Sequence, residues 1–239
     1  MRVKVVRGID REVLYDDSHW ELLKSKRERG VDVLKALKNF NIQAYIYGSV
    51  ARGDVHKDSD VDVIIPYMIN PFIIELVVEE KFGNIYAKEI VRATPKHALK
   101  GHIYIDSSTT ISFPLTPFSR LEQEFYKFGG LIGLPEGEDY RNRVPGVDKR
   151  LVLILPTDNG HKEISILGRE EWVAKILDVS IDIVKERKHV LMRRDEVGRT
   201  GIYLKRNLDI DESFDRVLKE LIDKDPSIKR MLRSRKKQL

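Results

Sequence analysis

Two aspartates separated by one residue, Asp60 and Asp62, stand at the start of a short apolar stretch. Aspartate is depleted in β-strands and costly to bury, so a strand that only had to pack would not carry both. Because side chains alternate along a strand, we expect both carboxylates on one face, with Cα atoms about 7 Å apart. Carboxylates so arranged can bind hard cations such as Mg²⁺ and can bridge two ions about 3.5–4 Å apart. The pair therefore predicts a metal site.

A small-residue turn precedes the two aspartates. Gly48 and Ser49 follow the apolar stretch AYIY and offer backbone N–H groups and a hydroxyl with little steric bulk. Such groups can hold a triphosphate beside the metals. The stretch GSVARGDV lacks the Lys-Ser/Thr ending of a P-loop, and the sequence contains no G-x-S-x-G nucleophile elbow. The turn and the aspartates thus predict a site for a nucleoside triphosphate and metal ions.

The segment GSVARGDVHKDSDVDVII (48–65) resembles the signature of the DNA polymerase β-like nucleotidyltransferase superfamily, and is most similar to its minimal members. In that family a strand leads to Gly-Ser, a helix follows with an Arg-Gly pair, and the next strand carries Asp-x-Asp. The resemblance covers about residues 30–110, which is less than half of the chain. The positions that match are Gly48, Ser49, Arg52, Gly53, Ser59, Asp60 and Asp62.

The resemblance implies that a nucleoside monophosphate moves from an NTP to an acceptor hydroxyl, with release of pyrophosphate. It implies that Asp60 and Asp62 bind Mg²⁺ or Mn²⁺, and that one carboxylate helps to deprotonate the acceptor. The residues that it assigns to nucleotide binding are Gly48, Ser49, Arg52 and Ser59.

The family also has a third catalytic, metal-binding carboxylate on a later strand. Glu89, in IYAKEIVRA, falls at the acidic position, although glutamate is one methylene longer than the usual aspartate. Asp106, in HIYIDSS, is the rival candidate. The sequence leaves the choice between them open.

Apolar periodicity predicts strands mixed with helices, and the resemblance implies an α/β (α+β) fold with a polymerase β-like mixed sheet and flanking helices. We expect a helix over 20–40, split into two at Gly30, and a second helix over 71–83 that begins with Pro and ends with Gly. Strands are expected at 41–49, 59–66, 85–93, 102–108 and 109–115. The nucleotidyltransferase domain is therefore expected to span 1–115.

An extension over 116–168 is expected to pack on this domain. It contains a predicted helix at 119–130, a loop at 134–148 and a β-hairpin that turns at Asn159-Gly160.

Residues 169–239 resemble a winged helix-turn-helix domain with a basic tail. Ser180 is a natural N-cap between two amphipathic helices, and 195–206 would form a Gly-containing β-ribbon, the wing. The resemblance implies contact with RNA or DNA through the second helix. A module that only packs against protein is the alternative, since Asp182 and Glu186 would repel phosphate. The candidate contacts are Lys185, Arg187, Lys188, Arg193, Arg194 and Arg199.

The composition limits the class of protein. The 239 residues include no cysteine and no apolar run near 18 residues, which excludes disulfides and predicts neither a transmembrane helix nor a signal peptide. We expect a cytoplasmic protein, and the mixed charge of 34% favours a thermophilic source. Residues 1–160 hold equal numbers of basic and acidic residues, so the whole net charge of +5 lies in residues 161–239.

Two functions follow from the sequence. The first is a metal-dependent nucleotidyltransferase, and the second is a nucleic-acid-binding regulator that keeps the fold with little or no catalysis. The paired aspartates favour the enzyme. The acceptor, the nucleotide base and the oligomeric state are not determined by the sequence.

Overall fold

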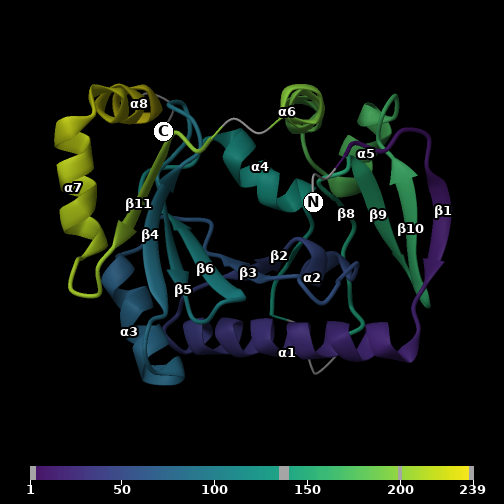
Figure 1. Cartoon of the computed structure of the whole chain (residues 1–239), viewed down its shortest axis with the longest axis horizontal. Helices are drawn as coiled ribbons and strands as arrows, with labels where there is room; N and C mark the ends of the chain where they lie inside the picture. The colour runs from purple at the N-terminus through teal and green to yellow at the C-terminus, as the bar shows by residue number, and fades with distance from the viewer. Residues whose placement is uncertain (1–3, 135–139, 199–200, 237–239) are drawn as a thin grey trace.

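The computed structural model describes residues 4–134, 140–198 and 201–236, and contains two β-sheets with helices between and around them (Figure 1). The larger sheet has seven strands, and its mixed topology confirms the expected fold class. Strands β3 and β6 run parallel, and their other neighbours pair antiparallel. In spatial order the strands are β11 (Leu204–Leu208), β4 (Ala87–Arg92), β5 (Lys100–Tyr104), β6 (Thr109–Pro114), β3 (Val61–Ile64), β2 (Tyr45–Tyr47) and β7 (Leu131–Ile132).

One face of this sheet is apolar and packs against helices. Ile46, Val63 and Ile111 are fully buried on it. Each such side chain contributes roughly 1.5–3 kcal/mol when removed from water, so this core holds the central strands in place. The helices that share the core include α1 (Asp17–Asn39), α3 (Pro71–Phe82), α7 (Phe214–Lys224) and α8 (Pro226–Lys236).

Helix α1 is continuous, so the expected break at Gly30 is wrong. Gly30 instead lies where the helix packs against Ile46 of β2. A Cβ atom at this position would lie 2.5 Å from Ile46 Cδ1, which is a severe overlap. The glycine therefore allows close packing of the helix on the strand and forms no turn.

The smaller sheet forms a second core. Its order is β1 (Asp10–Leu14), β10 (Gly160–Ser165), β9 (Val152–Thr157) and β8 (Gly146–Val147). Helices α5 (Glu170–Leu177) and α6 (Ile181–Val197) pack on it, with Ser180 capping α6 as expected. Helix α4 (Arg120–Phe128) lies between the two sheets: Phe128 belongs to the second core, whereas Tyr126 contacts Tyr47 of the large sheet.

The expected hairpin forms, but its turn is shifted by one residue. Gly160 pairs with Thr157, so the turn consists of Asp158 and Asn159. Gly160 is the first residue of β10, and a Cβ atom there would lie 1.9 Å from the carbonyl oxygen of Val13 in β1. The glycine is thus needed for the close approach of two strands.

The expected wing is wrong. Residues 195–197 continue helix α6, and 204–208 form β11, an edge strand that pairs with β4 of the large sheet. The region after residue 169 is divided between the two cores, because α5 and α6 join the small sheet whereas β11, α7 and α8 join the large one.

The expected basic tail forms helix α8 up to Lys236, and this helix packs against the large sheet, while 237–239 fall outside the described residues. Ile228 is fully buried, and Arg235 is buried against Glu122 at 2.7 Å. Within the part of the chain that the structure describes, no helix is both long and apolar enough to cross a membrane.

Candidate active site

The Gly-Ser turn lies at the end of β2. Gly48 is the N-cap of the four-residue helix α2 (Ser49–Arg52), and its φ of +80° is a conformation that glycine adopts without strain. Its N–H donates to the carbonyl of Gly130 at 3.0 Å. No atom lies within 4 Å of where a Gly48 Cβ would stand, so the turn is open to a ligand on that side.

The two aspartates lie at the start of β3. Asp60 is exposed immediately before the strand, and Asp62 is partly buried within it. Burial and the neighbouring charge of Asp60 raise the pKa of Asp62 to about 6, and the cations Lys149 and Lys100 act in the opposite direction. The fold has therefore brought two like charges together with incomplete compensation, as expected of a cation site.

Polar side chains share the sheet face of Asp62. The register places Tyr47 of β2 and Thr110 of β6 directly beside it, and Tyr104 of β5 beside Thr110. One step along the face, Ser112 and His102 approach within 2.8 Å. Because burial is the main cause lowering the pKa of His102 to about 4, its ring is neutral near pH 7. The face opposite the apolar core is thus a polar surface around Asp62.

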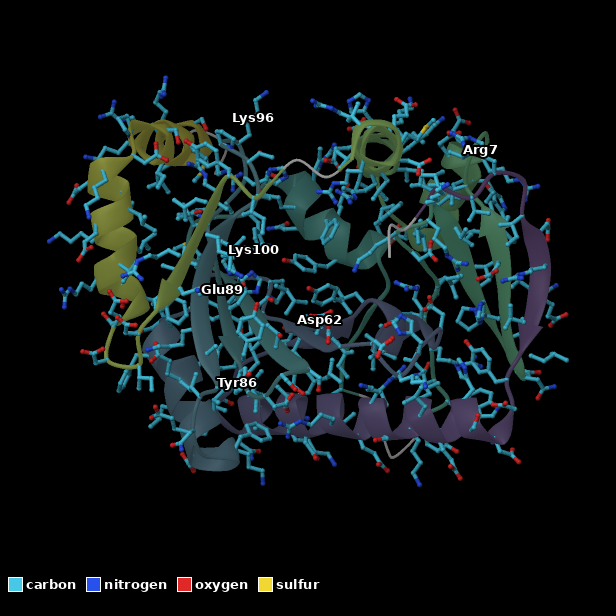
Figure 2. All side chains as sticks on the ribbon, viewed as in Figure 1. Arg7, Asp62, Tyr86, Glu89, Lys96 and Lys100 are labelled. Carbon is cyan, nitrogen blue, oxygen red and sulfur yellow. The ribbon has the colours of Figure 1, made fainter. Side chains whose placement is uncertain are left out.

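Lys100 contributes a positive charge to this surface (Figure 2). Its ammonium group lies 5.9 Å from the ring centroid of Tyr126 in α4, a distance typical of a cation–π contact. Burial is the first cause that lowers the pKa of Lys100, while the charges of Glu122 and Asp62 oppose it. Helix α4 therefore covers one end of the polar face with an aromatic ring.

Arg52 and Ser59 hold the loop between the turn and the aspartates. All three guanidinium nitrogens of Arg52 donate to protein oxygens, two to Asp54 at 2.9 Å and one to the Gly129 carbonyl at 2.6 Å. Ser59 is buried, and its hydroxyl accepts from the His56 amide at 3.0 Å. Both side chains lie near the site, and these hydrogen bonds join them to other groups of the protein.

The structure does not bring Glu89 to the aspartates, which corrects its expected role as third metal ligand. Strands β5 and β6 separate β4 from β3, so Glu89 is about 14 Å from Asp62 across the sheet at the usual strand spacing. Tyr104 donates to Glu89 at 2.6 Å, and Lys205 pairs with it at 2.7 Å. Burial alone would raise the pKa of Glu89, but these two partners outweigh burial and lower it.

Asp106, the other candidate for the third metal ligand, is also bound to residues outside the aspartate pair. It lies in the β5–β6 turn and pairs with Arg29 of α1 at 2.7 Å, while its other oxygen accepts from the Ser108 amide at 2.8 Å. Burial would raise the pKa of Asp106, but these groups lower it to about 2.

The donors present fit a hard divalent cation. Asp60 and Asp62 supply carboxylate oxygens, the ligands that Mg²⁺ prefers. A bound cation would offset the two causes that raise the Asp62 pKa, which are burial and the charge of Asp60. Across the described ranges, no group of three His, Cys, Asp or Glu side chains could hold a metal ion. The protein alone thus provides two carboxylates, and a nucleotide would have to supply further oxygen ligands.

The six basic residues expected at nucleic acid are not equivalent. Lys185 and Arg193 are exposed on one side of α6, and Lys188 on the same side pairs with Glu170 of α5. Arg187 lies on another side, 5.0 Å from the ring centroid of Phe125, and burial lowers its pKa. Arg194 is exposed on α6, and Arg199 falls outside the described residues.

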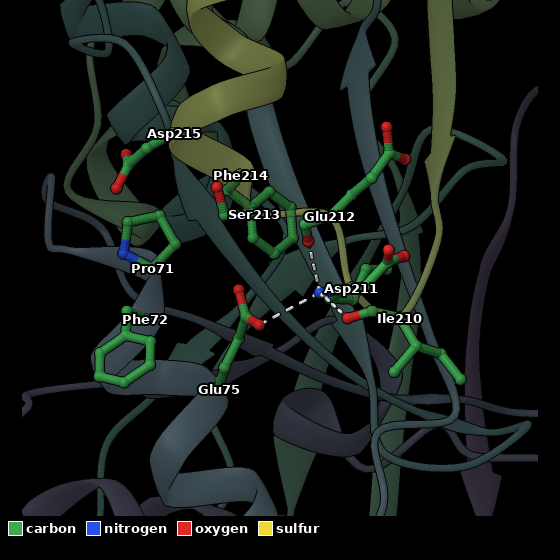
Figure 3. Close-up of a pocket in the computed structure, with 10 residues that line it drawn as sticks. Pro71, Phe72, Glu75, Ile210, Asp211, Glu212, Ser213, Phe214 and Asp215 are labelled. Carbon is green, nitrogen blue, oxygen red and sulfur yellow. Dashed lines mark hydrogen bonds and ion pairs between the residues drawn. The ribbon is translucent and has the colours of Figure 1, made fainter.

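A cavity of about 210 Å³ lies between α3 and the β11–α7 connection, on the apolar side of the sheet (Figure 3). The ammonium group of Lys88 contacts Glu75 at 3.2 Å and the carbonyls of Ile210 and Glu212 at 3.0 and 2.7 Å. Lys88 alternates with Glu89 along β4 and faces away from the aspartates. This cavity therefore belongs to the packing of α7 and lies outside the candidate site.

Sequence reasoning missed several side chains around Asp62. Lys100, His102 and Tyr104 alternate in β5, and Thr110 and Ser112 alternate in β6. This period of two was a readable signal for one polar face. Lys149 could not have been found this way, because it reaches the site from the turn between β8 and β9.

Comparison with known families agrees with this arrangement. Residues 28–105 match the family model of the nucleotidyltransferase domain, which includes the Gly48-Ser49 turn and both aspartates. Neither the curated proteins nor the solved structures gave a significant match to the chain. With the turn, the aspartates and the mixed sheet in the expected order, this part of the chain is a nucleotidyltransferase domain of the DNA polymerase β-like superfamily.

Proposed function

We propose that the protein is a metal-dependent nucleotidyltransferase, which moves a nucleoside monophosphate from an NTP to an acceptor hydroxyl. The observation that carries this proposal is the pair Asp60 and Asp62 beside the open Gly48-Ser49 turn, with two lysines near enough to lower the Asp62 pKa. A carboxylate pair supplies a metal site, and the turn and lysines supply the phosphate site. The match over residues 28–105 supports the same reaction class.

The residues of this chain then have separate roles. Asp60 and Asp62 hold Mg²⁺ or Mn²⁺, which when bound would offset the negative charge of the phosphates. Gly48 and Ser49 contact the triphosphate with backbone N–H groups and the hydroxyl. Arg52 and Ser59 act through the loop, since their present contacts keep the turn and β3 in register.

The reaction exchanges a phosphoanhydride bond of the NTP for a phosphate ester bond to the acceptor. The acceptor oxygen forms a bond to the α-phosphorus, the bond between the α-phosphorus and the α,β-bridging oxygen breaks, and pyrophosphate leaves. The proton of the acceptor hydroxyl passes to one of the two carboxylates. Lys149, which is exposed beside the site, is suited to neutralise the leaving pyrophosphate.

The test is transfer of label from each α-³²P-NTP into a cell extract, with Mg²⁺ or Mn²⁺. We expect the Asp60→Asn/Asp62→Asn variant to lose at least about 100-fold in activity, as removal of transition-state charge compensation usually does. Asp58→Asn is the matched control, because Asp58 is an exposed aspartate two residues before the pair. Absence of label with every nucleotide would contradict the proposal, and nuclease or protease sensitivity of the label would identify the acceptor class.

The second candidate is a nucleic-acid-binding regulator with a weakly active or inactive nucleotidyltransferase fold. The separation of Glu89 from the aspartates favours it, as do the exposed cations Lys185 and Arg193 on α6. Filter binding of RNA and DNA tests it with Lys185→Ala/Arg193→Ala. The control is Arg216→Ala/Lys219→Ala, which removes the same charge from exposed positions of α7. A regulator would lose affinity with the first variant and keep it in Asp60→Asn/Asp62→Asn.

A further inference from the structure

A two-metal phosphoryl-transfer site places two divalent cations about 3.5–4 Å apart and compensates their four positive charges with several carboxylates. In this protein β3 lies between β2 and β6, and β2 places Tyr47 beside Asp62. The neighbouring strand left to offer a third carboxylate that could share the cations with Asp60 and Asp62 is therefore β6. The identity of the β6 residues on the polar face therefore decides how many cations the site can hold.

Thr110 occupies this position. It is the direct partner of Asp62 in the parallel β3–β6 ladder, so both side chains point to the same face from adjacent strands. The next residue of β6 on that face is Ser112, whose hydroxyl contacts His102 at 2.8 Å. A neutral hydroxyl is a weak ligand for a divalent cation compared with a carboxylate. The position that would complete a second cation site thus carries no charge.

The other carboxylates near the sheet are engaged elsewhere. Glu89 lies three strands from Asp62 and is paired with Lys205, while Asp106 is paired with Arg29 of α1. Lys100 and Lys149 already place positive charge within range of Asp62. A second divalent cation would therefore enter a site in which two lysines already balance two carboxylates. No net negative charge of these groups would favour its binding.

We infer that the site binds one divalent cation with the nucleotide, and that Thr110 is the residue that limits it to one. This inference rests on the proposed function and departs from a two-metal arrangement. In place of a second cation, the ammonium groups of Lys100 and Lys149 supply the remaining positive charge around the triphosphate.

The test counts bound metal independently of activity. Equilibrium dialysis of the full chain with Mn²⁺ and α,β-methylene-ATP, with both ligands present on both sides, gives moles of each bound per mole of protein. We expect one Mn²⁺ per bound nucleotide, and loss of that ion in Asp60→Asn/Asp62→Asn. Two Mn²⁺ per nucleotide would overturn the single-cation inference and leave the proposed function standing. No Mn²⁺ and no nucleotide bound would overturn both.

Thr110→Asp adds the missing carboxylate. Thr110→Asn is the control, because asparagine has nearly the same shape as aspartate and carries no charge. We expect Thr110→Asp to bind two Mn²⁺ per nucleotide and Thr110→Asn to bind one. One Mn²⁺ per nucleotide in a folded Thr110→Asp variant would show that Thr110 does not set the number of bound cations. Should this variant fail to fold, the count for the unmodified chain still decides between one cation and two.

Discussion

Asp62 is the residue whose environment connects the fold to the proposed chemistry. Its neighbours on the polar face are neutral hydroxyl groups, its sequence neighbour Asp60 is a like charge, and its two cations are lysines on other elements. The balance between these like and opposite charges determines whether the site attracts a cation.

The raised pKa of Asp62 predicts a pH-dependent stability. A carboxyl group with a pKa of about 6 when folded and 3.8 when unfolded stabilises the folded state below pH 4, and this contribution is lost as the pH rises through 6. We expect Asp62→Asn to gain about 1–3 kcal/mol relative to the unmodified chain between pH 4 and 7, in metal-free buffer. Urea unfolding of both proteins across this range measures it. If the free energies of unfolding of the two proteins changed in parallel with pH, the raised pKa of Asp62 would be contradicted.

At the scale of elements, the contact between α1 and β2 holds the strand that leads into the Gly48-Ser49 turn. A Cβ atom at Gly30 would meet the end of the Ile46 side chain, which would have to shift to make room for it. This helix-to-sheet contact explains why the sequence tolerates a glycine within a 23-residue helix, where its propensity costs about 1 kcal/mol relative to alanine.

Gly30→Ala should therefore destabilise the protein despite the better helix propensity of alanine. Overpacking against Ile46 costs about 1–3 kcal/mol, which exceeds the propensity gain. Ile46→Val removes the Cδ1 atom in the overlap, so the double variant should recover about 1 kcal/mol relative to the sum of the single changes. Thermal or urea unfolding of the unmodified chain, the two single variants and the double variant measures all four free energies of this double-mutant cycle. Additive effects would mean that the two residues do not share this contact.

At the scale of the whole molecule, the C-terminal segment completes the sheet that carries the aspartates. β11 extends the large sheet at β4, and α8 returns to α4, where Arg235 donates to the carbonyl of Lys96 at 2.8 Å and pairs with Glu122. The last helix is thereby linked to the helix that covers one end of the polar face.

A charged tail and a packed helix predict different responses to substitution. Ile228→Ala removes a fully buried side chain of α8 and should cost about 2–5 kcal/mol in the free energy of unfolding. Arg230→Gln and Arg233→Gln are exposed on the same helix, and each should change stability by less than about 0.5 kcal/mol. Urea unfolding of the three variants measures these changes in the free energy of unfolding. Equal small effects at all three positions would indicate that α8 does not stabilise the large sheet.

Local signals in the sequence were sufficient for most elements near the site. Pro71 and Gly83 bound α3, Ser180 caps α6, and the alternation around Asp60 and Asp62 gives β3. These features act over a few residues, so they can be read without the fold. The wing failed as a prediction because strand pairing partners are set by the whole sheet, and a short apolar stretch such as 202–204 carries no mark of its partner.

The sequence by itself determined the nucleotidyltransferase signature, the sides of the strand on which the aspartates stand, and the absence of disulfide chemistry. The tertiary structure decided which other residues share that site. Strand order lies beyond local pattern, since it depends on how a complete set of apolar faces is buried together. That order separated Glu89 from the aspartates, placed Thr110 beside Asp62, and brought Lys100 and Lys149 within electrostatic range.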